Sequence, residues 1–233
     1  MSENNFPAGA GIASSASAFA ALALAASSAA GLSLQEHELS HLARLGSGSA
    51  CRSIPVGFVE WLAGEDDRSS YAVSIAPAEH WDLVDLICVV DEGHKAVGST
   101  AGHALAYSSA LNPLRIAGVP QRLTACKDAL LSRDFSRFAE VVESDSDWMH
   151  AVMRTSSPPL RYWTETTELI LWSVRAWRDA GRALCTTVDA GPNVHVLALP
   201  SEAEWAKQEL ARIPGVLRVL EARPGGGAFL IPE

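Results

Sequence analysis

The chain has 233 residues, a hydrophobic content of 48% and a formal net charge of −9 at pH 7. This length and composition are those of a globular protein with one large domain or two small ones. The acidic balance argues against nucleic acid as a partner, because binding a phosphate backbone requires a basic surface. The four cysteines are scattered without a C-x-x-C pair, which favours reduced thiols in a cytoplasmic protein over a disulfide framework or a zinc site.

The first long segment, residues 13–30, is uncharged and consists mostly of alanine and serine. The residues before it contain no Lys or Arg, so it lacks the basic start of a signal peptide. A membrane-spanning helix would need bulkier apolar side chains. We therefore predict a buried helix over residues 14–30 that ends at Gly31, and a soluble protein without a membrane segment.

Ser33-Leu34-Gln35-Glu36 resembles a capping box and predicts a second helix over residues 34–45. This helix contains His37-Glu38-Leu39-Ser40-His41, which matches the H-E-x-x-H pattern of zinc proteases. A zinc site needs a third ligand and a cleft, and the sequence marks neither. We interpret both histidines as partly exposed residues and rank a zinc hydrolase last among the alternatives.

The apolar run at residues 83–90 is nearly continuous and predicts a buried strand. We place a domain boundary just before it, so that the two predicted domains are residues 1–78 and 79–233. Further strands are expected over residues 57–62, 71–76, 183–188, 194–199, 216–222 and 228–231, and further helices over residues 101–112, 119–132, 134–154, 162–180 and 201–212. This order predicts an α+β fold with helices on one side of an antiparallel sheet. Trp163, Trp172 and Trp177 in the helix over 162–180 are expected to fill the core.

The stretch from Asn4 to Ser17, NNFPAGAGIASSAS, leads directly into the first helix. Glycine lets backbone N–H groups crowd around an anion, and the first turn of a helix leaves its N–H groups without partners. Hydroxyls at Ser14, Ser15 and Ser17 add further donors at the positive end of the helix dipole. The local chemistry allows two interpretations, a phosphate cradle or a tight loop packed against an alanine-rich helix.

Two later stretches favour the phosphate cradle over the tight loop. Residues 46–53 read GSGSACRS, a glycine/serine loop that contains Arg52, and residues 186–193 read TTVDAGPN, which places Asp189 at the end of an apolar run. In this order and combination the three stretches resemble the mevalonate diphosphate decarboxylases of the GHMP kinase superfamily. The resemblance extends over nearly the whole chain.

The resemblance implies a two-domain GHMP kinase-like α+β fold, with a partial ribosomal protein S5 domain 2-like N-terminal part and a ferredoxin-like C-terminal domain. Members of this family use ATP and Mg²⁺ to phosphorylate the tertiary 3-hydroxyl of a phosphorylated mevalonate. The intermediate then loses phosphate and carbon dioxide to give isopentenyl diphosphate. The family also implies a cytoplasmic homodimer.

Three residues match the family's catalytic positions. Asp189 matches its catalytic aspartate, a carboxylate that orients the tertiary hydroxyl and takes up its proton; by itself the motif also suits an Asx-turn. Arg52 matches the arginine that holds the C1 carboxylate, which a planar guanidinium grips with two hydrogen bonds; the alternative is a surface ion pair. Ser47 matches a serine at the substrate.

The other matches concern the ligands. Gly11, Ala13, Ser14, Ser15 and Ser49 correspond to ATP-binding positions, and Ser15 is the one near the triphosphate and its metal. Arg52, Ser47 and Ser99 correspond to substrate-binding positions, with Ser99 near the phosphate end. No protein ligand to the magnesium ion is predicted, because Mg²⁺ is held largely by phosphates and water.

The sequence also departs from the family. The family has a lysine- and tyrosine-bearing motif on strands that precede the Asn-Asn-Phe-Pro stretch, whereas this sequence begins at Met1. We expect a fragment, a misassigned start or a partner that supplies these strands. Asp147 stands where the family usually has asparagine, and Ile54-Pro55-Val56-Gly57 replaces a more glycine-rich segment. The open alternatives are a phosphomevalonate decarboxylase, a mevalonate 3-kinase-type enzyme and a truncated, inactive binding module.

Overall fold

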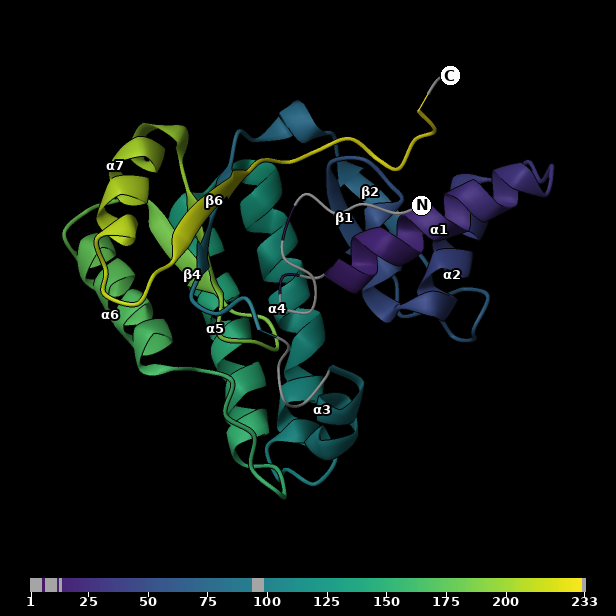
Figure 1. The fold of residues 1–233 in the computed structure, drawn as a ribbon. Helices are drawn as coiled ribbons and strands as arrows, with labels where there is room; N and C mark the ends of the chain where they lie inside the picture. Colours follow the sequence, from purple (N-terminus) through teal and green to yellow (C-terminus); the bar gives the residue numbers. More distant parts are fainter. Residues whose placement is uncertain (1–5, 7–11, 13, 94–98, 232–233) are drawn as a thin grey trace. The chain divides into compact units, whose positions relative to one another are not determined.

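The computed structural model describes residues 6, 12, 14–93 and 99–231 (Figure 1). It divides into two compact units: unit 1 holds residue 6 and the described residues within 13–82 and 224–233, and unit 2 holds residue 12 and those within 83–223. The predicted domain limits, 1–78 and 79–233, stay a prediction. Within the described ranges, every helix is too short or too polar to cross a membrane.

Unit 1 is built on two helices that pack through small side chains. Its elements are α1 (Ser14–Ala29), α2 (Glu36–Gly46), the 3₁₀ segment η1 (Gly48–Ser53), the antiparallel pair β1 (Phe58–Trp61) and β2 (Ala72–Ala76), and η2 (Ala78–His80). Along α1, Ala16, Ala20 and Ala23 form a buried stripe at helical spacing. The last two belong to a core cluster with Ala43 of α2 and Ala50 of η1. Side chains this small let the segments approach closely, and the predicted helix over 14–30 is confirmed.

The start of α2 corrects the predicted cap. The helix begins at Glu36, and the N–H of Gln35 donates to Oε2 of Glu38 at 2.8 Å. The capping residue is therefore Gln35, two positions later than the predicted Ser33. His41 pairs with Asp67 at 2.9 Å, and the described part of the chain contains no cluster of three or more His, Cys, Asp or Glu that could bind a metal ion.

Unit 2 is an antiparallel four-stranded sheet with helices, as the predicted α+β fold requires. Its elements are β3 (Val84–Val89), α3 (Ser99–Ala106), α4 (Asn112–Ser132), α5 (Phe135–Arg154), α6 (Glu165–Asp179), β4 (Leu184–Thr187), β5 (Val194–Ala198), α7 (Pro200–Ala211) and β6 (Arg218–Ala222). The strand order is β4-β5-β3-β6, and Val196 of β5 is opposite both Leu86 of β3 and Thr186 of β4.

Two predicted elements were wrong. The helix predicted over 101–112 ends at Ala106, and α4 then runs from Asn112 through Pro120 without a break. The strand predicted over 228–231 does not form; in unit 1 the N–H of Ala228 donates to the carbonyl of Ile54 at 3.0 Å. A single backbone contact outside the sheet is not enough to make these residues a strand.

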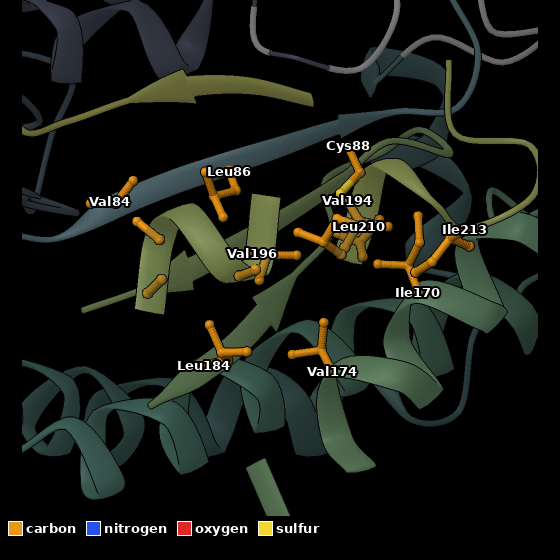
Figure 2. Packing of buried hydrophobic residues seen from close by; sticks show 14 residues of the cluster. Val84, Leu86, Cys88, Ile170, Val174, Leu184, Val194, Val196, Leu210 and Ile213 are labelled. Atoms are coloured by element: carbon orange, nitrogen blue, oxygen red, sulfur yellow. The ribbon is translucent and has the colours of Figure 1, made fainter. Parts of the chain in front are cut away.

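The core of unit 2 lies between one face of the sheet and helices α6 and α7 (Figure 2). Alternate strand residues point into it, which follows from the period of two along a strand. Figure 2 labels its larger members: Val84, Leu86, Cys88, Ile170, Val174, Leu184, Val194, Val196, Leu210 and Ile213. Trp163 and Trp177 pack against this core, but Trp172 is 71% exposed. Core filling by Trp172 was therefore a wrong prediction, because the buried positions of α6 are 167, 170 and 174.

We expect Leu184→Ala to lower the free energy of unfolding by about 2–5 kcal/mol, because it leaves a cavity beneath α6 and α7. Leu184 is completely buried, whereas Leu217 is 62% exposed and provides the matched control. Urea unfolding followed by circular dichroism measures both variants. Equal losses in the two variants would show that Leu184 does not lie in a tightly packed core.

Candidate functional site

In unit 1, two serines far apart in the sequence meet at the start of α1. Oγ of Ser15, in the first turn of the helix, lies 3.1 Å from Oγ of Ser47, which links α2 to η1. The Oγ of Ser17 is turned back to the carbonyl of Ser14 at 3.1 Å and is not directed outward. One of these two hydroxyls donates to the other, so the second hydroxyl hydrogen and the first-turn N–H groups make this corner a donor-rich surface suited to an anion.

A buried serine holds the neighbouring η1 segment in place. Ser40 of α2 is fully buried, and its Oγ donates to the carbonyl of Cys51 at 3.0 Å and accepts from the N–H of Ala72 at 2.9 Å. One side chain thus joins α2, η1 and β2. Burial raises the pKa of the Cys51 thiol, against the opposing effect of the adjacent Arg52 charge, so the thiol stays protonated and unreactive.

Arg52 lies in the last turn of η1, directly after this anchor, and its side chain is exposed. Among the described residues no carboxylate forms an ion pair with Arg52, whereas Arg44 of the same unit is paired with Asp67. Ser49 and Ser47 are half-buried in the same stretch. The segment therefore presents an exposed guanidinium, without an ion pair to a described carboxylate, beside two hydroxyls.

In unit 2, Asp189 follows the edge strand β4 and is exposed, while Val188 before it is buried. The turn is closed by the backbone, because the N–H of Gly191 donates to the main-chain carbonyl of Asp189 at 2.8 Å. The Asp189 carboxylate itself accepts no hydrogen bond from the described residues, so the Asx-turn is not the arrangement observed. An exposed carboxylate on a closed turn is suited to meet a ligand.

Two buried side chains fix the exit of this turn. Oγ1 of Thr167 in α6 donates to the carbonyl of Pro192 at 2.6 Å. Oδ1 of Asn193 accepts from the N–H groups of Val90 and Asp91 at 2.6 and 3.1 Å, and its Nδ2 donates to the carbonyl of Asp91 at 3.0 Å. The loop after Asp189 is therefore tied both to α6 and to the end of β3.

His150 of α5 contacts the residue before Asp189. Its Nε2 lies 2.9 Å from the carbonyl of Val188 and its side chain is 2% exposed. Burial lowers the pKa of His150 from 6.5 to about 4, against the opposing effect of the hydrogen bond to Val188. The ring is neutral near pH 7, and Nε2 carries the hydrogen because it faces a carbonyl oxygen.

Asp147, one of the departures from the family, lies on the outer part of α5. It is 3.8 Å from Arg175 of α6, and both line a cavity of about 190 Å³ together with Glu143, Ser146, Trp163, Glu168, Leu171, Trp172 and Thr186. Burial raises the pKa of Asp147, while Arg175 opposes the shift. Asp147 therefore faces Arg175, an arginine of the same unit.

The remaining predicted site residues are only partly described. Gly11 and Ala13 lie outside the described residues. Ser99 is the first residue of α3, and its side chain lies outside the described part. Within unit 1 the structure brings Ser15, Ser47, Ser49 and Arg52 together in two adjoining segments, whereas Asp189 belongs to unit 2.

Two models of known families match the chain. A family model described as the diphosphomevalonate decarboxylase-like N-terminal domain matches residues 1–72, and one described as the mevalonate 5-diphosphate decarboxylase C-terminal domain matches residues 85–215. The chain belongs to the diphosphomevalonate decarboxylase family. Both matches contain predicted site residues: Arg52 and the serines of unit 1 lie in the first, and Ser99 and Asp189 in the second.

Curated members of the diphosphomevalonate decarboxylase family include an enzyme of Candida albicans, 46% identical over 83% of this chain and 55% of its own length. The enzyme of Bos taurus is 40% identical over 85% of this chain and 50% of its own length. The chain thus spans about half the length of the curated relatives it matches.

Solved structures of the family agree with the fold. The mevalonate diphosphate decarboxylase of Staphylococcus aureus has a TM-score of 0.89 and 34% identity, over 96% of this chain and 68% of that one. MDDEF, solved in complex with MVAPP, AMPPCP and magnesium, has a TM-score of 0.88 and 37% identity, over 95% of this chain and 68% of that one. These similarities confirm the two-domain GHMP kinase-like architecture that the resemblance implied.

Sequence analysis did not find the supporting side chains. Ser40 lies inside the H-E-x-x-H match, yet it shares the buried face of α2 with Leu39 and Ala43. Thr167 likewise occupies a core-facing position of α6 beside Ile170. The sequence signal that could have revealed these two residues is a polar side chain at an otherwise apolar helix position, since a buried polar group needs a hydrogen-bond partner.

We expect the free energy of unfolding to fall as the pH drops from 6.5 towards 4, the window between the ordinary and the lowered pKa of His150. The unfolded chain takes up a proton there and the folded chain does not, which costs up to roughly 3 kcal/mol of stability. Urea unfolding at a series of pH values measures this, with His150→Gln as the control that lacks the ring. Parallel pH curves for the two proteins would contradict the assignment.

Proposed function

We propose that this chain carries out the ATP-dependent decarboxylation of diphosphomevalonate to isopentenyl diphosphate. The observation that carries the proposal is the Asp189 carboxylate, exposed and without a hydrogen bond from the described residues, on a turn held by Thr167 and Asn193. Membership of the diphosphomevalonate decarboxylase family supports it, as do relatives named for this reaction and the complex of MDDEF with MVAPP, AMPPCP and magnesium.

Asp189 acts on the tertiary 3-hydroxyl of the substrate. As the hydroxyl oxygen attacks the γ-phosphoryl group of ATP, its proton passes to the Asp189 carboxylate and ADP leaves. The 3-phosphate then departs with the electrons of its C–O bond, and the electrons of the bond to the C1 carboxylate form the alkene. The products are isopentenyl diphosphate, carbon dioxide, phosphate and ADP, which balances the reaction.

Arg52 binds the C1 carboxylate that is lost. A guanidinium offers two parallel N–H donors to a carboxylate, which orients it for departure as carbon dioxide. The Arg52 side chain is exposed, which makes these donors accessible to a carboxylate. Ser47 and Ser99 complete the contacts to the substrate in this proposal, Ser47 beside Arg52 and Ser99 towards the phosphate end.

In this proposal the start of α1 would hold ATP and its Mg²⁺. Hydroxyl and helix N–H donors, without a carboxylate among the described residues of this corner, fit phosphate oxygens and a magnesium ion that is held mainly by phosphates and water. Ser14, Ser15 and Ser49 donate to the nucleotide, and Gly11 and Ala13 contribute backbone N–H groups. Bound Mg²⁺ neutralises the triphosphate during transfer. A cytoplasmic homodimer also stays a prediction.

The deciding assay is release of phosphate and carbon dioxide from diphosphomevalonate with Mg-ATP. It is run on this chain and, in parallel, on the chain joined to the N-terminal segment of a full-length relative. Release of both products by either form supports the proposal. Phosphate transfer without release of carbon dioxide would replace the proposal with a mevalonate 3-kinase-type activity. If both forms are folded and neither releases either product, the remaining alternative is a truncated, inactive binding module.

We expect Asp189→Ala to lower kcat by about 10²–10⁴-fold, because the proton acceptor is lost. The affinity for ATP, measured by calorimetry, should change little, since the donors to the nucleotide lie in unit 1. Asp128→Ala, at an exposed carboxylate of α4, is the matched control. Turnover like that of the unmodified protein would remove Asp189 from this role.

Arg52→Lys should lower kcat/KM by about 10–100-fold, because an ammonium group cannot make the paired hydrogen bonds to a carboxylate. Steady-state kinetics measure the effect, and Arg68→Lys, at an exposed arginine of unit 1, is the control. A loss of stability with unchanged kcat/KM would make Arg52 a structural residue.

A further inference from the structure

The outer side of β4 lacks a neighbouring strand, because β4 is an edge of the sheet. Unpaired edge N–H and C=O groups are costly when they are buried, so they need partners other than a strand. In unit 2 the helix α5 provides partners for the N–H of Thr186 and for both backbone groups of Val188, and Figure 1 shows α5 alongside β4.

Three α5 side chains bind the backbone of β4 and the residue after it. The N–H of Thr186 donates to Oε1 of Glu143 at 3.1 Å, and the N–H of Val188 donates to Oγ of Ser146 at 3.1 Å. Nε2 of His150 donates to the carbonyl of Val188 at 2.9 Å. The three helix positions are separated by three and four residues, so they lie on one face of α5.

These side chains are themselves fixed. Glu143 is buried and bound through both carboxylate oxygens by the guanidinium of Arg178, with Nη2–Oε2 at 2.7 Å. Ser146 is buried. The His150 ring packs against Trp163 with the ring centroids 4.7 Å apart. Each contact to β4 therefore comes from a side chain with little freedom to move.

We propose that Ser146 and His150 are positioning residues for the Asp189 carboxylate. Together they occupy both hydrogen-bonding groups of Val188, the residue directly before Asp189. Because Thr167 and Asn193 fix the chain after the turn, α5 provides the missing restraint before it. This inference rests on the proposed function of Asp189.

A purely structural role makes a different prediction. If α5 only protects the sheet edge, loss of a contact lowers the stability and leaves kcat of the folded protein unchanged. If it positions Asp189, kcat falls in protein that is still folded, since a displacement of about 1 Å can cost about 10²-fold in rate. The ratio of the effects on kcat and on ATP affinity distinguishes the two roles.

The test compares Ser146→Ala with Ser146→Thr. The first removes the acceptor for the Val188 N–H, and we expect kcat to fall about 10–100-fold with ATP affinity changed by less than about threefold. The second keeps the hydroxyl, and its added methyl group has room because Ser146 lines the cavity of about 190 Å³. We expect its kcat to stay within about threefold of the unmodified protein. Ser144→Ala, at an exposed serine of the same helix, is the control.

His150 provides a second pair of variants should Ser146→Ala not fold. His150→Gln keeps an amide donor for the Val188 carbonyl, whereas His150→Phe keeps a ring and removes the donor. We expect His150→Phe to lower kcat more than His150→Gln does. Amide hydrogen exchange at Asp189 and Gly191 should accelerate in Ser146→Ala and His150→Phe, and this readout does not require turnover.

The outcomes separate this inference from the proposed function. Full turnover by Asp189→Ala would overturn the proposed function, and with it the role assigned to Ser146. An inactive Asp189→Ala beside a fully active, folded Ser146→Ala and His150→Phe would overturn only the positioning role. Equal kcat losses in Ser146→Ala and Ser146→Thr, or unchanged exchange at Asp189, would overturn it as well.

Discussion

The unpaired edge of β4 is the constraint on which the structure of unit 2 depends most. A strand at the edge of a sheet must satisfy its outward backbone groups, and here a helix binds three such groups, at Thr186 and Val188, with a carboxylate, a hydroxyl and an imidazole. The same hydrogen bonds that close the edge also fix the backbone directly before Asp189. Fold stability and placement of the candidate catalytic carboxylate therefore come from one set of contacts.

Unit 1 depends on small residues for the close packing of its segments. A stripe of alanines along α1 allows α2 and η1 to approach it closely, and Ser40 satisfies backbone groups of both η1 and β2. This close packing places Ser15 next to Ser47 although 32 positions separate them in the sequence. Large apolar side chains on that face of α1 would hold the two serine-bearing segments apart.

Charge on the whole chain and charge at the site have opposite signs. The chain carries a net charge of −9, yet the described donors around η1 are a guanidinium, hydroxyls and helix N–H groups. Short-range donors with fixed geometry decide anion binding at such a corner, because screening weakens the field of distant carboxylates beyond about 8–10 Å. The negative net charge is therefore compatible with an anion site at this corner.

Sequence alone determined the α+β class, most helices and strands, and the three stretches that contain Arg52, the serines and Asp189. These features depend on local periodicity and on short motifs, which are written in consecutive residues. Sequence did not determine where α2 is capped, that α4 begins at Asn112 well before Pro120, or that Trp172 is exposed, because neighbouring segments decide those outcomes.

Only the tertiary structure decided which polar residues support the site. Glu143, Ser146 and His150 look like ordinary polar positions of an amphipathic helix, and nothing local links them to residues 186–188. Their role appears when an edge strand about forty residues later presents backbone groups that water cannot reach. Hydrogen bonds between distant segments depend on the final packing, and for that reason the sequence pattern could not reveal them.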